Sequence, residues 1–189
     1  AYVVLPVLRE KTVDLTVSFI PGGGASADNI QYRVEPETIT VAGADEDVAE
    51  LTEISLGSID LATVGGAGDI QVTMTIDLDP RLVNVSGVTT ATVTFALEGL
   101  ETRTFQTENI TTTELTGYRA SVVTQVLSVQ IRGTAEDLDL IDPSQIRVVA
   151  DLSGITSTGT FPVAARVYLD AAGGAGVIGS YTVMVNVSR

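Results

Sequence analysis

The stretch Ile39-Thr-Val-Ala-Gly43 returns ninety residues later as Val129-Gln-Ile-Arg-Gly133. In both stretches, apolar side chains at every second position precede a glycine, which is typical of a half-buried strand that ends in a turn. Other segments recur in the same order at an offset of 90 or 91 residues: Asp60-Leu61 with Asp151-Leu152; Val72, Met74, Ile76 and Leu78 with Val163, Ala165, Val167 and Leu169; and Val93, Phe95 and Leu97 with Val183, Val185 and Val187. A repeat of this length predicts two tandem modules, residues 1–98 and 101–189, joined near Glu98-Gly99-Leu100-Glu101.

The composition of the chain favours strands over helices. Val, Ile and Thr make up about a third of its 189 residues, and their branched Cβ atoms suit a pleated strand better than a helix. Apolar and short polar side chains alternate over 12–19, 72–78 and 91–97, as in strands with one buried face. We therefore expect an all-β fold of two tandem β modules. The expected core residues are Val17, Val41, Ile76 and Phe95 in the first module and Val129, Ile131, Val167 and Val185 in the second.

One short helical turn is expected in each module, directly after the glycine of the repeated stretch. Thr134-Ala-Glu-Asp137 has the spacing of a capping box and leads to the apolar residues Leu138, Leu140 and Ile141, after which Pro143 is expected to stop the turn. In the first module, Asp45 is expected to cap a turn that carries Val48.

The charge and the missing residue types exclude several classes of function. Ten Lys and Arg against 24 Asp and Glu give a formal net charge of −14, which opposes binding to nucleic acid or to an anionic membrane surface. Because there is no His and no Cys, the chain lacks an imidazole base, a thiolate nucleophile and the ligands that zinc, copper and haem prefer. We expect no enzyme activity, no catalytic or metal-binding residue, no cofactor and no small-molecule substrate.

Two glycine-rich segments match the dinucleotide-binding fingerprint in letters. They are Gly174-x-Gly176-x-x-Gly179 and the relaxed form Gly22-x-Gly24-x-x-Ala27. The fingerprint binds a pyrophosphate only where its last position opens a helix, and the residues after both segments alternate as strands do. Both are therefore predicted to be turns, and Lys11, the only lysine, does not follow a glycine-rich loop as a phosphate-binding lysine would.

Three groups of carboxylates raise the question of calcium. They are Asp45-Glu46-Asp47, Asp77-Leu-Asp79 and Asp137-Leu-Asp139. Calcium takes oxygen ligands, but the spacing of an EF-hand loop is absent. Acids in the first turn of a helix and on a solvated face explain these groups better than a metal does.

An ordered set of motifs in the first module resembles the YbbR repeat. Tyr32-Arg-Val-Glu-Pro36 precedes the strand that ends at Gly43, and a short apolar turn then leads to Ile59-Asp-Leu61. This is the order of that repeat: an aromatic residue, an extended segment with proline, a strand ending in glycine, a helical turn and Ile-Asp-Leu. The second module resembles the terminal form of the repeat over Leu127–Gly133 and Ile141–Gly154, although Pro36 has no counterpart before Leu127.

The resemblance implies a location and a partner. It implies a bacterial protein outside the cell membrane, anchored by a membrane helix that precedes residue 1. It also implies a protein partner, a membrane-bound diadenylate cyclase whose synthesis of cyclic di-AMP the protein modulates. A tandem β adhesin or stalk, stiffened by calcium, is the alternative. For a surface that binds protein, exposed tyrosines are the expected anchors: Tyr2, Tyr32, Tyr118 and Tyr168.

Overall fold

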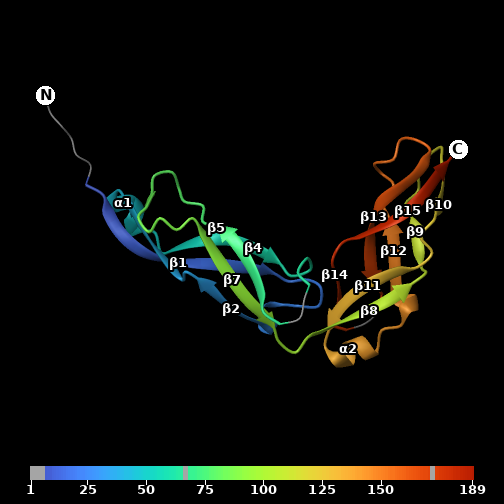
Figure 1. Ribbon diagram of the computed structural model, residues 1–189, viewed down its shortest axis with the longest axis horizontal. Helices are drawn as coiled ribbons and strands as arrows, with labels where there is room; N and C mark the ends of the chain where they lie inside the picture. The colour runs from blue at the N-terminus through green and yellow to red at the C-terminus, as the bar shows by residue number, and fades with distance from the viewer. Residues whose placement is uncertain (1–6, 66–67, 171–172) are drawn as a thin grey trace. The chain divides into compact units, whose positions relative to one another are not determined.

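The computed structural model describes residues 7–65, 68–170 and 173–189, and these form two compact units (Figure 1). Of the described residues, the first unit comprises 7–20, 30–59 and 68–98, and the second comprises 21–29, 60–65 and everything from 99 onward. Residues 21–29 and 60–65 connect strands of the first unit, yet they belong to the second. The predicted division at 98–101 separates the chain into one part before it and one part after it, so it makes no prediction for two segments that lie before the division but belong to the second unit.

The first unit is built from strands in two sheets. Its strands are β1 (Arg9–Ile20), β2 (Ile30–Glu35), β3 (Thr38–Gly43), β4 (Glu53–Asp60), β5 (Ile70–Thr75), β6 (Val83–Asn84) and β7 (Thr90–Leu97). One sheet has the order β4-β1-β3-β6 and the other β2-β7-β5. The pairs β1–β3, β2–β7 and β5–β7 are antiparallel, so each sheet has one face for the core and one that can be solvated.

The second unit repeats these neighbours. Its strands are β8 (Glu101–Thr107), β9 (Ile110–Thr112), β10 (Arg119–Val122), β11 (Leu127–Gly133), β12 (Ile146–Ala150), β13 (Gly159–Leu169), β14 (Gly176–Ile178) and β15 (Tyr181–Ser188). The sheets have the orders β14-β11-β8 and β10-β15-β13-β12-β9. Thus β11 lies between β14 and β8 as β3 lies between β6 and β1, and β15 lies between β10 and β13 as β7 lies between β2 and β5. The predicted all-β fold of repeated β modules is confirmed.

One strand differs between the two halves. β1 is continuous, whereas its counterpart is divided into β8 and β9, and β9 pairs with β12 in parallel. Thr107 lies at the division with its side chain buried. Its hydroxyl donates to the Ile146 carbonyl at 2.9 Å and accepts from the Asn109 amide at 3.1 Å. These two bonds satisfy backbone groups where the ladder is interrupted, so the strand can pass from one sheet to the other.

The repeated stretches are alike in burial as well as in sequence. Residues 41–50 and 131–140 have the same order of buried, half-buried and exposed positions throughout. The Asp-Leu pair is also repeated in three dimensions. Asp60 accepts a hydrogen bond from the amide two residues later at 2.9 Å, and Asp151 does the same at 3.0 Å. Each aspartate therefore forms a local turn that places the following leucine, Leu61 or Leu152, in the core with no exposed surface.

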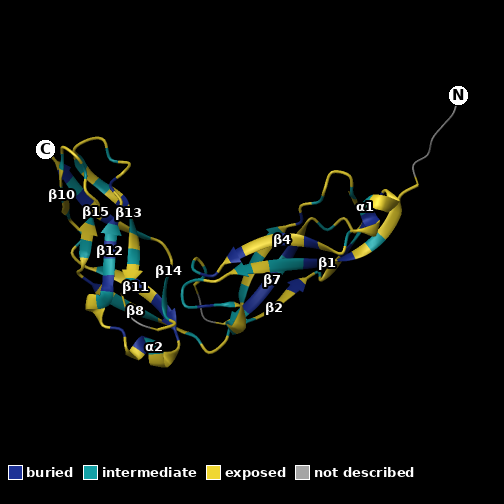
Figure 2. Cartoon of the chain, turned by 180° about the vertical axis from the view of Figure 1, so that it is seen from behind, coloured by how far each residue is buried: buried dark blue, intermediate teal, exposed yellow. Residues whose placement is uncertain are grey.

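The cores follow the predicted strand faces (Figure 2). Six of the eight expected core residues are buried: Val41, Ile76, Phe95, Val129, Ile131 and Val185. Val17 and Val167 are half-buried. Val167 packs against both core clusters of the second unit, one centred on β13 and β15 and the other on β11 and α2. Because the alternation places these side chains on one face of each strand, the predicted strand register is correct.

Both expected helical turns are present, as α1 (Asp45–Ala49) and α2 (Ala135–Asp139), together with two 3-10 turns, η1 (Ala27–Asn29) and η2 (Pro143–Gln145). Thr134 caps α2 as predicted, because its hydroxyl accepts from the Asp137 amide at 3.1 Å. The prediction that Asp45 caps α1 is wrong. Ala44 occupies the N-cap position without a side-chain bond, and Asp45 accepts a hydrogen bond from Arg9 instead.

Candidate interaction surface

The tyrosines predicted as anchors lie in different environments. Tyr32 is 53% exposed and Tyr168 is 40% exposed. Tyr118 is half-buried, packs against the core and donates to the Thr156 carbonyl at 3.0 Å. Tyr2 lies outside the described residues. Tyr32 and Tyr168 are therefore the two described tyrosines of this set that present a large aromatic face to a partner.

Tyr32 is held in place by an aromatic cluster of the first unit. Its ring meets Phe19 edge to face with 5.2 Å between centroids, and Phe19 meets the buried Phe95 in the same way at 5.3 Å. Tyr32 and Phe95 are also cross-strand neighbours on β2 and β7. A shallow cavity of about 230 Å³ adjoins this cluster and is lined by Gln31, Tyr32, Arg33, Asp69, Thr94, Phe95 and Ala96. Packing against Phe19, which itself packs on Phe95, restricts the Tyr32 side chain before any partner arrives, which lowers the entropic cost of binding.

Tyr168 is restrained by charge rather than by aromatic packing. The Arg147 guanidinium lies over its ring, 4.7 Å from the centroid. Arg147 also forms an ion pair with Asp170 at 3.2 Å. A cation over the ring face fixes the ring orientation, so β13 presents Tyr168 beside a positive and a negative group.

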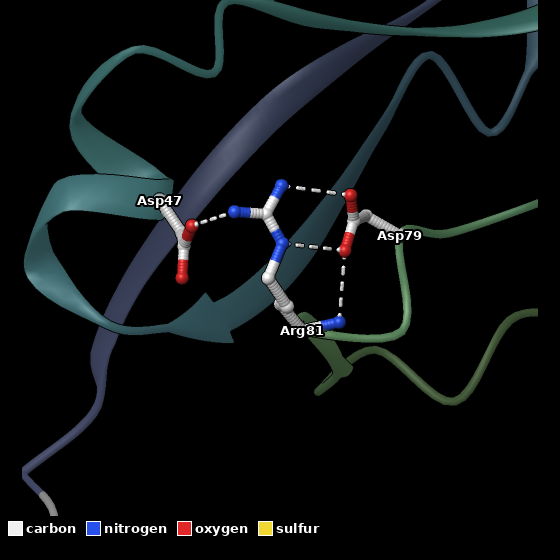
Figure 3. A network of polar contacts seen from close by, with 3 residues as sticks. All are labelled: Asp47, Asp79 and Arg81. Carbon is white, nitrogen blue, oxygen red and sulfur yellow. Dashed lines mark hydrogen bonds and ion pairs between the residues drawn. The ribbon is translucent and has the colours of Figure 1, made fainter.

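Asp47 and Asp79, from two acidic groups of the first unit, are bridged by one arginine (Figure 3). The Arg81 guanidinium bridges Asp47 at 2.6 Å and Asp79 at 2.9 Å. Hydrogen bonds from the side chain and the amide of Arg81 lower the pKa of the Asp79 carboxyl to about 2. The carboxylates at α1 and before β6 thus form a connected surface network and have basic partners of their own.

The acids at α2 are engaged in a similar way. Arg103 forms ion pairs with Glu101 and Asp139, and Asp137 accepts a hydrogen bond from the Thr134 hydroxyl at 2.9 Å. Across residues 7–65, 68–170 and 173–189, no group of three or more acidic side chains is arranged to hold a metal ion.

The glycine-rich segment 22–27 is a turn, as predicted, whereas the segment 174–179 contains the short strand β14 between its turns. Gly176 begins β14 and Gly179 forms the turn into β15, so no helix follows them. Gly22 pairs with Ala25 in a tight bridge, and a single 3-10 turn, η1, follows. Neither segment presents the N-terminus of a helix to a phosphate group.

Two surface features were not predicted from the sequence. Leu140 follows α2 with 72% of its surface exposed. Charge is also divided unequally, with 15 Asp and Glu against four Lys and Arg in residues 1–98, and nine against six in residues 99–189. A count by halves would have revealed this second feature, and it gives the first half the stronger negative field.

The comparisons with known proteins identify part of the chain. Residues 106–187 match the family model of the YbbR-like protein. No curated protein matches. A solved YbbR-like protein from Streptococcus pneumoniae TIGR4 is 18% identical, with the whole of this chain and 98% of that one covered and a TM-score of 0.34. The solution structure of SuR18C from Streptococcus thermophilus is 17% identical over 48% of this chain and 84% of that one, with a TM-score of 0.37.

The matched range begins within β8 and ends within β15. It therefore contains β9 to β14 completely, most of β15 and the last two residues of β8. None of the helices in the described part of the chain has the length and apolar character needed to cross a membrane. Residues 106–187 are thus the part of the chain that matches the YbbR-like protein family.

Proposed function

We propose that this chain is a non-catalytic interaction module that works on the outer face of a bacterial cell membrane. The observation that carries the proposal is the YbbR-like domain at residues 106–187. The composition supports it, because a chain without His or Cys has none of the side chains that most enzymes use as base or nucleophile near neutral pH.

The surface supports binding to a protein. Tyr32 and Tyr168 are exposed aromatic side chains held by their neighbours, and preorganised aromatic residues are frequent hot spots of interfaces. The excess of carboxylates, strongest in residues 1–98, favours a partner with basic loops, because opposite charge speeds encounter and orients the two surfaces.

The proposed partner is a membrane-bound diadenylate cyclase, and the proposed effect is modulation of cyclic di-AMP synthesis. This step rests on the resemblance of both halves to YbbR repeats. It also fits the chemistry of the chain, since the catalytic work would be done by the cyclase and this chain would need only a binding surface. An anchoring helix before residue 1 would hold that surface close to the membrane.

The proposal is tested by capture from detergent-solubilised membranes that contain a tagged diadenylate cyclase. The immobilised chain should retain the cyclase, and Tyr32→Ala or Tyr168→Ala should weaken retention about tenfold or more if the tyrosine is a hot spot. Leu140→Ala is the matched control, because it removes a more exposed apolar side chain that is not aromatic. If the immobilised chain does not retain the cyclase, the proposed partner is contradicted. If the two tyrosine variants retain it as well as the unchanged chain does, the proposed anchors are contradicted.

A further inference from the structure

Arg132 on β11 is a buried charged side chain with no acidic partner among the described residues. Only 2% of its surface is exposed, and it takes part in none of the ion pairs of the described chain. Burial lowers the pKa of its guanidinium, although arginine stays charged in proteins. A charge this deeply buried has to be compensated by hydrogen bonds.

Four backbone carbonyls supply that compensation. Nε donates to Gly23 at 2.8 Å and Nη1 to Val64 at 2.8 Å. Nη2 donates to Leu61 at 2.7 Å and to Gly22 at 3.1 Å. The planar fork of arginine suits such a set, because its N–H groups point in fixed directions.

The four acceptors come from two separate segments, 21–29 and 60–65. These are the β1–β2 and β4–β5 connections, and both belong to the second compact unit. Other close approaches hold them there. A Cβ on Gly24 would lie 2.2 Å from the Arg132 carbonyl oxygen, and one on Gly176 would lie 2.3 Å from the Gly24 amide nitrogen. The Gly179 amide also donates to the Ala62 carbonyl at 3.0 Å. Arg132 is the only group among these that binds both segments.

The repeat shows that this arginine is specific to one half. The position that corresponds to Arg132 is Ala42, which is buried as well. In the second half, the corresponding connections, near Thr113 and Thr156, are held by hydrogen bonds of side chains from that same half. Thr113 accepts from the Leu152 amide at 2.9 Å, and Tyr118 donates to the Thr156 carbonyl at 3.0 Å. The same pair of connections is thus closed by Arg132 in one half and by local side chains in the other.

We propose that Arg132 is a latch that holds segments 21–29 and 60–65 in the second unit. Because these segments continue directly into β1, β2, β4 and β5, the latch makes the stability of the first unit depend on the folding of the second. The Arg132 guanidinium is bound by the four backbone carbonyls, and its role is to hold the conformation of the two segments.

Hydrogen exchange of the whole chain, measured by mass spectrometry, tests the latch. In Arg132→Met, exchange should rise about 10- to 100-fold in both segments, as loss of one or two charged hydrogen bonds would cause, while β13 and β15 stay protected. Arg147→Met is the matched control, since it also removes a guanidinium from the second unit but has no bond to either segment. Unchanged exchange in the segments of Arg132→Met, or an equal rise in the control, would overturn the proposal.

Two further measurements keep the test decisive if Arg132→Met fails to fold. Arg132→Lys keeps the charge but loses the fork, so it should raise exchange in the same two segments by a smaller factor. In Arg132→Ala, millimolar guanidinium, well below denaturing concentrations, should restore part of the protection, whereas equimolar sodium should not. If exchange rises uniformly over the whole chain in Arg132→Lys, or if guanidinium does not restore protection in Arg132→Ala, the proposed role of Arg132 is contradicted.

Discussion

The two leucines of the repeated Asp-Leu pair should be equally important to the cores that contain them. Leu61 and Leu152 have no exposed surface, and each follows an aspartate that turns the backbone at the end of a strand. Replacing Leu152 by alanine removes buried methyl groups and leaves a cavity, which costs about 2–5 kcal/mol in free energy of unfolding. For a chain of this size, that corresponds to a fall in Tm of about 4–20 °C.

Leu140→Ala is the control for this prediction, because it is the same substitution at a position that is 72% exposed. It should change the free energy of unfolding by no more than about 0.5 kcal/mol. Urea denaturation followed by far-UV circular dichroism measures both variants. A loss below about 1 kcal/mol for Leu152→Ala, or an equal loss for Leu140→Ala, would refute the assignment of Leu152 to the core.

Three further predictions concern charge, backbone and calcium. The pKa of Asp79, about 2, lies below its ordinary value, so the stability that the carboxylate contributes is present above pH ~4 and is lost as the pH falls toward ~2. In Arg81→Met, carboxyl NMR should find a higher pKa for Asp79, and an unchanged pKa would exclude the ion pair as the cause of the low value. Gly24 and Gly87 both have positive φ, 73° and 71°, but only at Gly24 would a Cβ meet other atoms. Gly24→Ala should therefore lower the Tm more than Gly87→Ala does, and equal losses of Tm would argue against close packing at Gly24. The Tm should be the same in calcium as in EDTA; a rise with calcium would favour the stalk alternative.

Much of the fold could be predicted because it depends on local pattern. The alternation of apolar and polar residues predicted which face of each strand is buried, and Thr134 predicted the start of α2. Asp45 was misassigned as a cap because its residue type fits the role, while the position that corresponds to Thr134 is Ala44, which has no side-chain acceptor. Propensity identifies the turn but does not place its first residue to within one position.

The role of Arg132 could not be predicted from the strand pattern. In β11 the inward positions are Leu127, Val129 and Ile131, so Arg132 lies on the outward face, where a charged residue is ordinary. It is buried because segments distant in sequence cover that face, and alternation carries no information about them. The contrast with Ala42 in the other copy of the repeat was the one signal available.

The surface assignments depended on similar long-range information. Tyr32 and Tyr118 both look like amphipathic aromatic residues in the sequence. Tyr118 is half-buried because it packs against the core of the second unit, and its hydroxyl donates to the Thr156 carbonyl, 38 residues away. Exposure of an aromatic side chain is decided by such tertiary neighbours, and sequence alone could name the candidates without ranking them.

The central claim, a non-catalytic module that acts through a cyclase, is tested most directly by the rate of cyclic di-AMP synthesis. A diadenylate cyclase in membrane vesicles, with its outer face accessible, should change its rate when this chain is added, and Tyr32→Ala or Tyr168→Ala should reduce the change. The chain alone, with ATP and without the cyclase, should form no cyclic di-AMP. An unaltered cyclase rate at saturating concentrations of the chain, or nucleotide turnover by the chain alone, would contradict the account.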